Sequence, residues 1–133
     1  MKPFPSCNIK LVTDDIRTID IRALLNQYGL KHFDAITCDI APNISGIRDV
    51  DAGNIEELYR SVHAIIMEGL KKGGNALLKS FFSESFRDIT VELKQTFSKV
   101  TVFKPLASRS ISSEIYLVCV DFHGQAQTTP ETR

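Results

Sequence analysis

Apolar residues recur along the chain in two alternating patterns, short continuous runs and steps of three or four. The short runs are typical of buried strands and lie at residues 9–13, 33–38 and 76–78. The three- and four-residue steps are typical of helices with one apolar face and lie at residues 19–29, 55–70 and 86–97. Gly73-Gly74 is expected to end the second helix, and Ser83 or Ser85 to cap the third. The first part of the chain is therefore predicted to alternate strand and helix.

Two more apolar runs, at residues 100–103 and 115–120, close the pattern. The polar loop between them is too short for a crossover helix, so these strands are expected to pair antiparallel. The whole order predicts an α/β sheet, mainly parallel, with a carboxy-terminal antiparallel hairpin. We expect one domain over residues 1–122 and a polar, disordered tail over residues 123–133.

Composition narrows the class of protein. Sixteen basic and sixteen acidic residues give a net charge of zero, so any binding to a polyanion depends on a local patch. Cys7, Cys38 and Cys119 lie far apart without metal-ligand spacing, which predicts free thiols in a reducing compartment and no metal site. The sequence has no apolar run of about 20 residues and no secretory signal, so we expect a soluble, intracellular protein without a membrane partner.

Charged residues stand at the ends of the predicted strands. Asp15, Asp39 and Lys79 follow strands, and Glu114 precedes the last strand, which is expected to run in the opposite direction. Ligands of α/β sheets bind at the carboxyl ends of the parallel strands. These four side chains are therefore expected to converge on one edge of the sheet.

Each of these residues also has an ordinary structural explanation. Asp39 could cap a turn, Lys79 could extend to solvent, and Glu114 could form a surface salt bridge. Taken together at three strand ends, the trio forms a candidate acid/base site in which carboxylates position a lysine.

Three segments carry a family pattern: DAITCDIAPNISG around Asp39, ALLKSFF around Lys79, and SRSISSEIYLVC around Glu114. In order, spacing and strand context they resemble the FtsJ family of RNA ribose 2′-O-methyltransferases. The resemblance implies a Rossmann-like class I methyltransferase fold and S-adenosylmethionine as methyl donor. Asp39, Lys79 and Glu114 would be the second to fourth members of the family's Lys-Asp-Lys-Glu tetrad.

The resemblance also implies how the donor and RNA are bound. Asp15 and its neighbour Ile16 would contact the adenine of S-adenosylmethionine, with Asp39 also on the donor side. Lys104 and Arg109, which flank the loop of the predicted hairpin, are the candidate contacts to RNA phosphates, although a solvated loop would explain these two residues nearly as well. Ribosomal RNA is the expected substrate. The segments KPFPSCNIKLVTDDIRT and KPLASRSISSEIYLVC are most similar to the eukaryotic nucleolar branch of the family, which implies a nucleolar location.

The sequence departs from the family where the donor should bind. No glycine-rich loop is found, and strands 1 and 2 of the family order 3-2-1-4-5-7-6 have no counterpart in the 133 residues. We expect either an amino-terminal segment or a homodimer partner to complete the sheet. Two alternatives remain open at this point, a catalytically inactive binding or scaffold module and an unrelated α/β nucleotide-binding enzyme. The lack of a phosphate loop counts against the second alternative.

Overall fold

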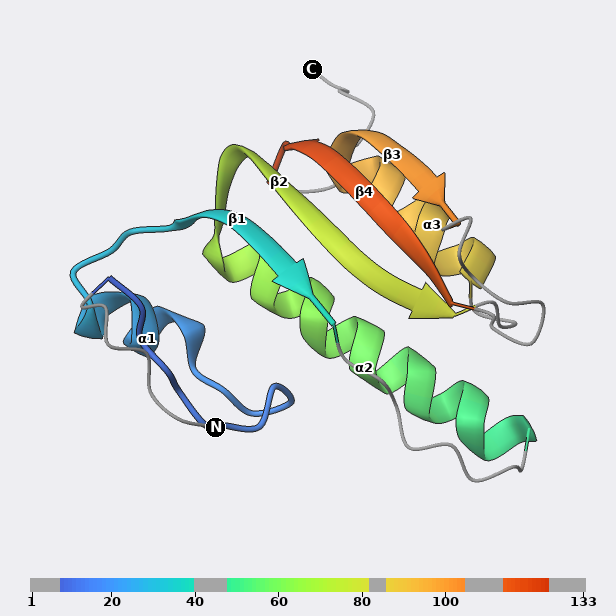
Figure 1. Ribbon diagram of the computed structural model, residues 1–133, viewed down its shortest axis with the longest axis horizontal. Coiled ribbons are helices and arrows are strands. Elements are labelled where there is room, and N and C mark those ends of the chain that lie inside the picture. The colour runs from blue at the N-terminus through green and yellow to red at the C-terminus, as the bar shows by residue number, and fades with distance from the viewer. Residues whose placement is uncertain (1–7, 40–47, 82–85, 105–113, 125–133) are drawn as a thin grey trace, which may run out of the picture.

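The computed structural model describes residues 8–39, 48–81, 86–104 and 114–124, and Figure 1 shows how the elements are arranged. In chain order the elements are α1 (Ile21–Gln27), β1 (Phe33–Cys38), α2 (Arg48–Gly69), β2 (Leu70–Phe81), α3 (Phe86–Thr96), β3 (Phe97–Phe103) and β4 (Glu114–Phe122). The predicted alternation of helix and strand is confirmed from residue 21 onward. None of the helices in the described part has the length and apolar character needed to cross a bilayer.

The four strands form one mixed sheet in the order β1-β2-β4-β3. β1 and β2 are parallel, and β4 is antiparallel to both of its neighbours, so β1, β2 and β3 share one direction. The predicted hairpin is confirmed as the pair of β3 and β4. The order equals the last four places, 4-5-7-6, of the methyltransferase sheet that the resemblance implied.

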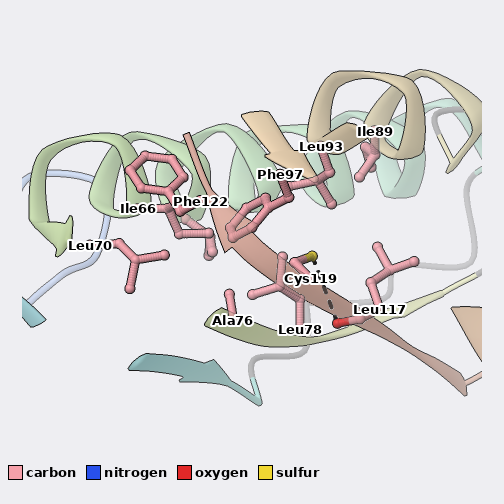
Figure 2. Packing of buried hydrophobic residues seen from close by; sticks show 11 residues of the cluster. Ile66, Leu70, Ala76, Leu78, Ile89, Leu93, Phe97, Leu117, Cys119 and Phe122 are labelled. Carbon is pink, nitrogen blue, oxygen red and sulfur yellow. Dashed lines mark hydrogen bonds between the residues drawn. The ribbon is translucent and has the colours of Figure 1, made fainter. Parts of the chain in front are cut away.

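The core lies between one face of this sheet and the helices α2 and α3 (Figure 2). Ile66 of α2 and Leu93 of α3 are fully buried against Leu78, Leu117 and Cys119 of the two central strands. Because side chains alternate across a strand, burying these positions turns their neighbours in sequence toward the opposite face. Lys79 directly follows the buried Leu78 on β2 and therefore lies on that opposite face.

Helix α1 packs at the carboxyl end of α2 and not on the main core. The Asp20 carboxylate caps α1 by accepting a hydrogen bond from the Ala23 backbone N–H at 3.0 Å. A Cβ at Gly69, the last residue of α2, would lie 3.0 Å from Ile21 of α1 and 2.9 Å from Phe33 of β1. Glycine is therefore what allows α1, α2 and β1 to meet at this point.

The predicted strand at residues 9–13 is wrong. These residues form no strand, and Ile9, Leu11 and Val12 are 44%, 46% and 48% exposed. A strand needs a hydrogen-bonding neighbour, and in the described sheet β1 is an edge strand that pairs with β2. An apolar, β-branched run therefore does not become a strand by its composition alone.

The predicted end of the second helix is also wrong. α2 ends at Gly69, and Gly73-Gly74 lies within β2. Gly73 has a φ of +84°, and the β1–β2 register shifts here, because Phe33 pairs with Leu70 while Ala35 pairs with Asn75. The glycine pair thus forms an irregular turn that brings β2 into register with β1. Phe97, assigned to a helix by its spacing, instead begins β3.

Candidate active site

Asp39 and Lys79 meet at the carboxyl ends of two parallel strands. The β1–β2 register pairs Cys38 with Leu78, so the next residue of each chain segment is Asp39 and Lys79 respectively. The Lys79 Nζ lies 2.6 Å from the Asp39 Oδ1, within the range of a charge-assisted hydrogen bond. The predicted convergence of these two residues is therefore seen directly.

The two partners differ in exposure. The Lys79 side chain is 15% exposed, whereas that of Asp39 is 77% exposed. A lysine so far removed from water is unfavourable without a paired anion, so Asp39 stabilises its charged form. The exposed carboxylate also leaves the pair accessible to a ligand from solvent. A partly buried amine beside an exposed carboxylate is suited to holding a hydroxyl group and moving its proton.

Tyr116 lies on the other side of Lys79. It is the β4 residue paired with Lys79 in the antiparallel register, and it is partly buried. Directly paired residues share a face of the sheet, with Cβ atoms about 4.5–5.5 Å apart. Lys79 is thus flanked by Asp39 and Tyr116 on the face away from the core. Sequence reasoning did not single out Tyr116, although strand alternation places it on the same face as position 114.

Glu114 is the first residue of β4, and its backbone pairs with Phe81. Phe81 lies two residues beyond Lys79 on β2, so position 114 is the diagonal neighbour of Lys79 in the register. The Glu114 side chain is outside the described part. Its predicted role in catalysis stays a prediction, and the strand register agrees with it.

The turn that contains Asp15 makes its contacts with Arg17 and α2. The Asp15 carboxylate accepts hydrogen bonds from the Arg17 backbone N–H at 2.9 Å and from the guanidinium at 2.9 and 3.1 Å. These hydrogen bonds from Arg17 lower the pKa of the Asp15 carboxyl group. Arg17 Nη1 also lies 3.9 Å from Glu57, and Ile16 packs against the core. Asp15 does not follow a strand, so its predicted contact with the donor stays a prediction.

The predicted phosphate contacts lie near the hairpin loop. Lys104 directly follows β3 and is exposed, while Arg109 lies outside the described residues. Across the described ranges, no three His, Cys, Asp or Glu side chains gather closely enough to hold a metal ion. A surface cleft of about 520 Å³ lies between Arg17 and the outer side of α2. The two guanidinium groups that line it, those of Arg17 and Arg60, are paired with carboxylates, so the cleft does not favour an anion.

Fold and site together define an α/β domain with an acid–lysine pair at the strand ends where such sheets bind their ligands. A family model described as FtsJ-like methyltransferase matches residues 1–122. The chain belongs to the FtsJ-like methyltransferase family.

Individual relatives agree with the family. Ribosomal RNA large subunit methyltransferase E of Methylobacillus flagellatus is 38% identical over 119 residues, which cover 89% of this chain and 56% of that protein. The protein of the same name from Methanothermobacter thermautotrophicus is 32% identical over 126 residues, which cover 94% of this chain and 59% of that protein. These bacterial and archaeal relatives give no support to a nucleolar branch.

A solved structure has the same fold. The crystal structure described as that of a ribosomal RNA methyltransferase from Plasmodium falciparum superposes with a TM-score of 0.70 at 25% identity. The match covers 93% of this chain and 68% of that chain. The present chain thus spans somewhat more than half the length of the two curated relatives above.

Proposed function

We propose that this chain carries the Lys79–Asp39 part of the active site of an S-adenosylmethionine-dependent RNA ribose 2′-O-methyltransferase. The observation that supports this most is the 2.6 Å contact between a partly buried lysine and an exposed carboxylate, at the ligand-binding edge of a sheet of this family. Ribosomal RNA is the proposed substrate, because the relatives are named for it. A reaction on ribosomal RNA takes place inside the cell.

The chemistry requires a weak nucleophile to react. S-adenosylmethionine, when bound, supplies an electrophilic methyl group on a sulfonium, and the acceptor is a ribose 2′-hydroxyl. Lys79 would orient this hydroxyl and, in its neutral amine form, take up its proton at Nζ, and Asp39 would hold the ammonium group that forms. Tyr116, which pairs with Lys79 in the β2–β4 register, would limit the movement of Lys79, and Glu114, two residues before Tyr116 on β4, is proposed to contact the same hydroxyl group.

The proposed donor contacts, Asp39, Asp15 and Ile16, differ in how readily each could reach S-adenosylmethionine. Asp39 is open to solvent and can accept a hydrogen bond from a ligand. Asp15 is already hydrogen-bonded through both carboxylate oxygens to Arg17, but Oδ2 accepts one of these bonds and keeps a lone pair with which it could accept another from adenine. Ile16 lies against the core beside it and would provide an apolar contact. Lys104 and Arg109 are the proposed RNA phosphate contacts, because a chain of zero net charge must bind RNA locally.

The experiment joins this chain to the part of the Methylobacillus flagellatus relative that lies outside the match. The joined protein is incubated with labelled S-adenosylmethionine and large-subunit ribosomal RNA, and the labelled nucleoside is identified. We expect a 2′-O-methyl nucleoside, recognised because the adjacent phosphodiester resists alkali. A methyl group found only on a base would contradict the proposal.

Calorimetry of the 133-residue chain with S-adenosylmethionine addresses the inactive-module alternative. Saturable binding that Asp39→Ala weakens would support a donor site in this chain. A joined protein that folds but neither binds the donor nor transfers a methyl group would favour the inactive module.

A further inference from the structure

Asp15 lies in a turn that fixes its backbone and one of its carboxylate oxygens. The Asp15 carbonyl oxygen accepts hydrogen bonds from the backbone N–H groups of Thr18 at 3.0 Å and Ile19 at 2.8 Å. The carboxylate Oδ1 accepts a hydrogen bond from the Arg17 backbone N–H at 2.9 Å, an arrangement by which aspartate side chains commonly stabilise turns. The position of Asp15 is therefore set by the turn itself.

The guanidinium group of Arg17 fixes the plane of the Asp15 carboxylate. Its Nε donates to Oδ1 at 3.1 Å, and its Nη2 donates to Oδ2 at 2.9 Å. Two parallel hydrogen bonds between a planar guanidinium and a carboxylate define the orientation of both groups. The side chains of Arg17 and Asp15 are 54% and 43% exposed, and an ion pair so exposed contributes little to folding stability. A role in stability therefore does not account for this geometry.

A second carboxylate, on α2, restricts Arg17 further. Glu57 Oε2 lies 3.9 Å from Arg17 Nη1, so the guanidinium stands between the turn and the helix. In Figure 1 the blue loop that precedes α1 reaches toward α2. Because Nη1 and Nη2 contact different carboxylates, rotation of the Arg17 side chain would lose both contacts. The orientation of the Asp15 carboxylate is thus tied to α2 through Arg17.

The same hydrogen bonds leave Asp15 able to accept one from a ligand. Among the described residues, Oδ1 accepts two hydrogen bonds and Oδ2 accepts one. A carboxylate oxygen has two lone pairs, so Oδ2 keeps one for a further donor. The hydrogen bonds from Arg17 also lower the pKa of the Asp15 carboxyl group and so favour its ionised form, which can only accept. Asp15 therefore suits an N–H group of a ligand and not a carbonyl.

We propose that Arg17 is a positioning residue for the methyl donor, which holds the Asp15 carboxylate with the remaining lone pair of Oδ2 toward the 6-amino group of adenine. This rests on the proposed function, in which Asp15 contacts that base. The amino group is the hydrogen-bond donor of the adenine ring, whereas the ring nitrogens accept. Since Arg17 acts through Asp15 and does not touch the donor, its effect on binding should depend on the presence of the amino group.

The test uses the joined protein and two ligands, S-adenosylmethionine and an analogue whose base is unsubstituted purine. The analogue lacks the 6-amino group and cannot donate to Asp15. Calorimetry measures both dissociation constants. We expect Arg17→Ala to weaken binding of S-adenosylmethionine at least about fivefold, because a hydrogen bond to a charged group loses its alignment. The same variant should change binding of the analogue by less than about twofold, since the interaction that it perturbs is already missing. A merely structural role would weaken both ligands equally, and that result would overturn the proposal.

Two further variants separate orientation from charge. Arg17→Lys keeps the positive charge but not the two parallel hydrogen bonds, so it should recover only part of the affinity that Arg17→Ala loses. Arg60→Ala is the matched control, because Arg60 lines the same cleft and pairs with Glu56 at 2.8 Å. It should leave the binding of both ligands within about twofold of the unchanged protein. Full affinity in Arg17→Ala, or an equal loss in Arg60→Ala, would overturn the proposal.

The role of Arg17 and the proposed function can fail separately. Formation of 2′-O-methyl nucleosides by a joined protein whose donor affinity does not respond to Arg17→Ala would uphold the proposed function and overturn the role of Arg17. Selective weakening of S-adenosylmethionine binding by Arg17→Ala, in a protein that methylates only a base, would uphold the role of Arg17 and contradict the proposed function. No donor binding by the unchanged joined protein would overturn the role of Arg17.

Discussion

Gly74 controls how β2 enters the sheet, and Gly74→Ala tests this directly. A Cβ added at Gly74 would lie 2.9 Å from the backbone oxygens of Asp34 and Lys71 and 2.8 Å from Leu70 Cδ1. Real Cβ atoms do not approach backbone oxygens so closely, and two of the three neighbours are backbone that cannot rotate away. Overpacking of this kind costs about 1–3 kcal/mol.

Gly74 lies where the pairing of β1 with β2 is irregular, so overpacking there also affects the candidate active site. Between the pairs Phe33–Leu70 and Ala35–Asn75, β2 uses five residues where β1 uses two. Beyond this irregularity the register is regular up to Cys38 and Leu78, and it places Asp39 beside Lys79. A shift of the backbone at Gly74 therefore also loosens the strand pair that forms the candidate active site.

Urea unfolding followed by far-ultraviolet circular dichroism measures the effect. We expect Gly74→Ala to lower the free energy of unfolding by about 1–3 kcal/mol, with an unchanged dependence on urea concentration. Gly53→Ala is the matched control, because Gly53 lies within α2 and an added Cβ there meets nothing within 4 Å. It should raise stability by about 0.5–1 kcal/mol. Equal stability of Gly74→Ala and the unchanged chain would refute the packing described at this turn.

Three further predictions concern the core. Burial lowers the pKa of His63, so the unfolded chain takes up a proton at this residue at a higher pH than the folded chain does. The free energy of unfolding should therefore be highest above pH about 6.5 and fall as the pH is lowered. Urea unfolding at several pH values should show a smaller fall for His63→Asn. Leu93→Ala, at a fully buried site, should cost about 2–5 kcal/mol, whereas Val91→Ala on the exposed side of α3 should change stability by less than about 0.5 kcal/mol. Burial raises the pKa of the Cys119 thiol to about 12. In a variant whose other two cysteines are replaced by serine, iodoacetamide at pH 8 should therefore modify Cys119 only after the protein is denatured.

The sheet and the acid–lysine pair could be predicted because local patterns and topology agree there. Apolar runs with intervening helical periodicity define parallel strands, and the residues after such strands lie at one edge of the sheet. The sequence alone therefore predicts that Asp39 and Lys79 lie close together. The antiparallel hairpin followed in the same way from the length of its loop.

The predictions that were wrong or missing concern segments whose structure depends on contacts with other elements of the fold. The run at residues 9–13 has the composition of a strand, but no described strand pairs with it. Gly73-Gly74 could end a helix or form a turn within a strand, and which occurs depends on the contact of α2 with β1 through Gly69. Tyr116 was missed because its importance comes from the register with Lys79, which the sequence of β4 alone does not contain.

The most direct measurement of the central claim is the rate of 2′-O-methyl transfer by the joined protein carrying Lys79→Ala. General acid–base groups contribute about 10²–10⁴-fold to rates, so we expect kcat to fall by at least about 100-fold while the chain stays folded. Lys71→Ala is the control, because Lys71 also pairs with an aspartate of β1, Asp34, at 3.4 Å, but lies at the opposite end of the same two strands. Its rate should stay within about twofold of the unchanged protein. Full activity of Lys79→Ala, or an equal loss in both variants, would contradict the assignment of Lys79 to catalysis.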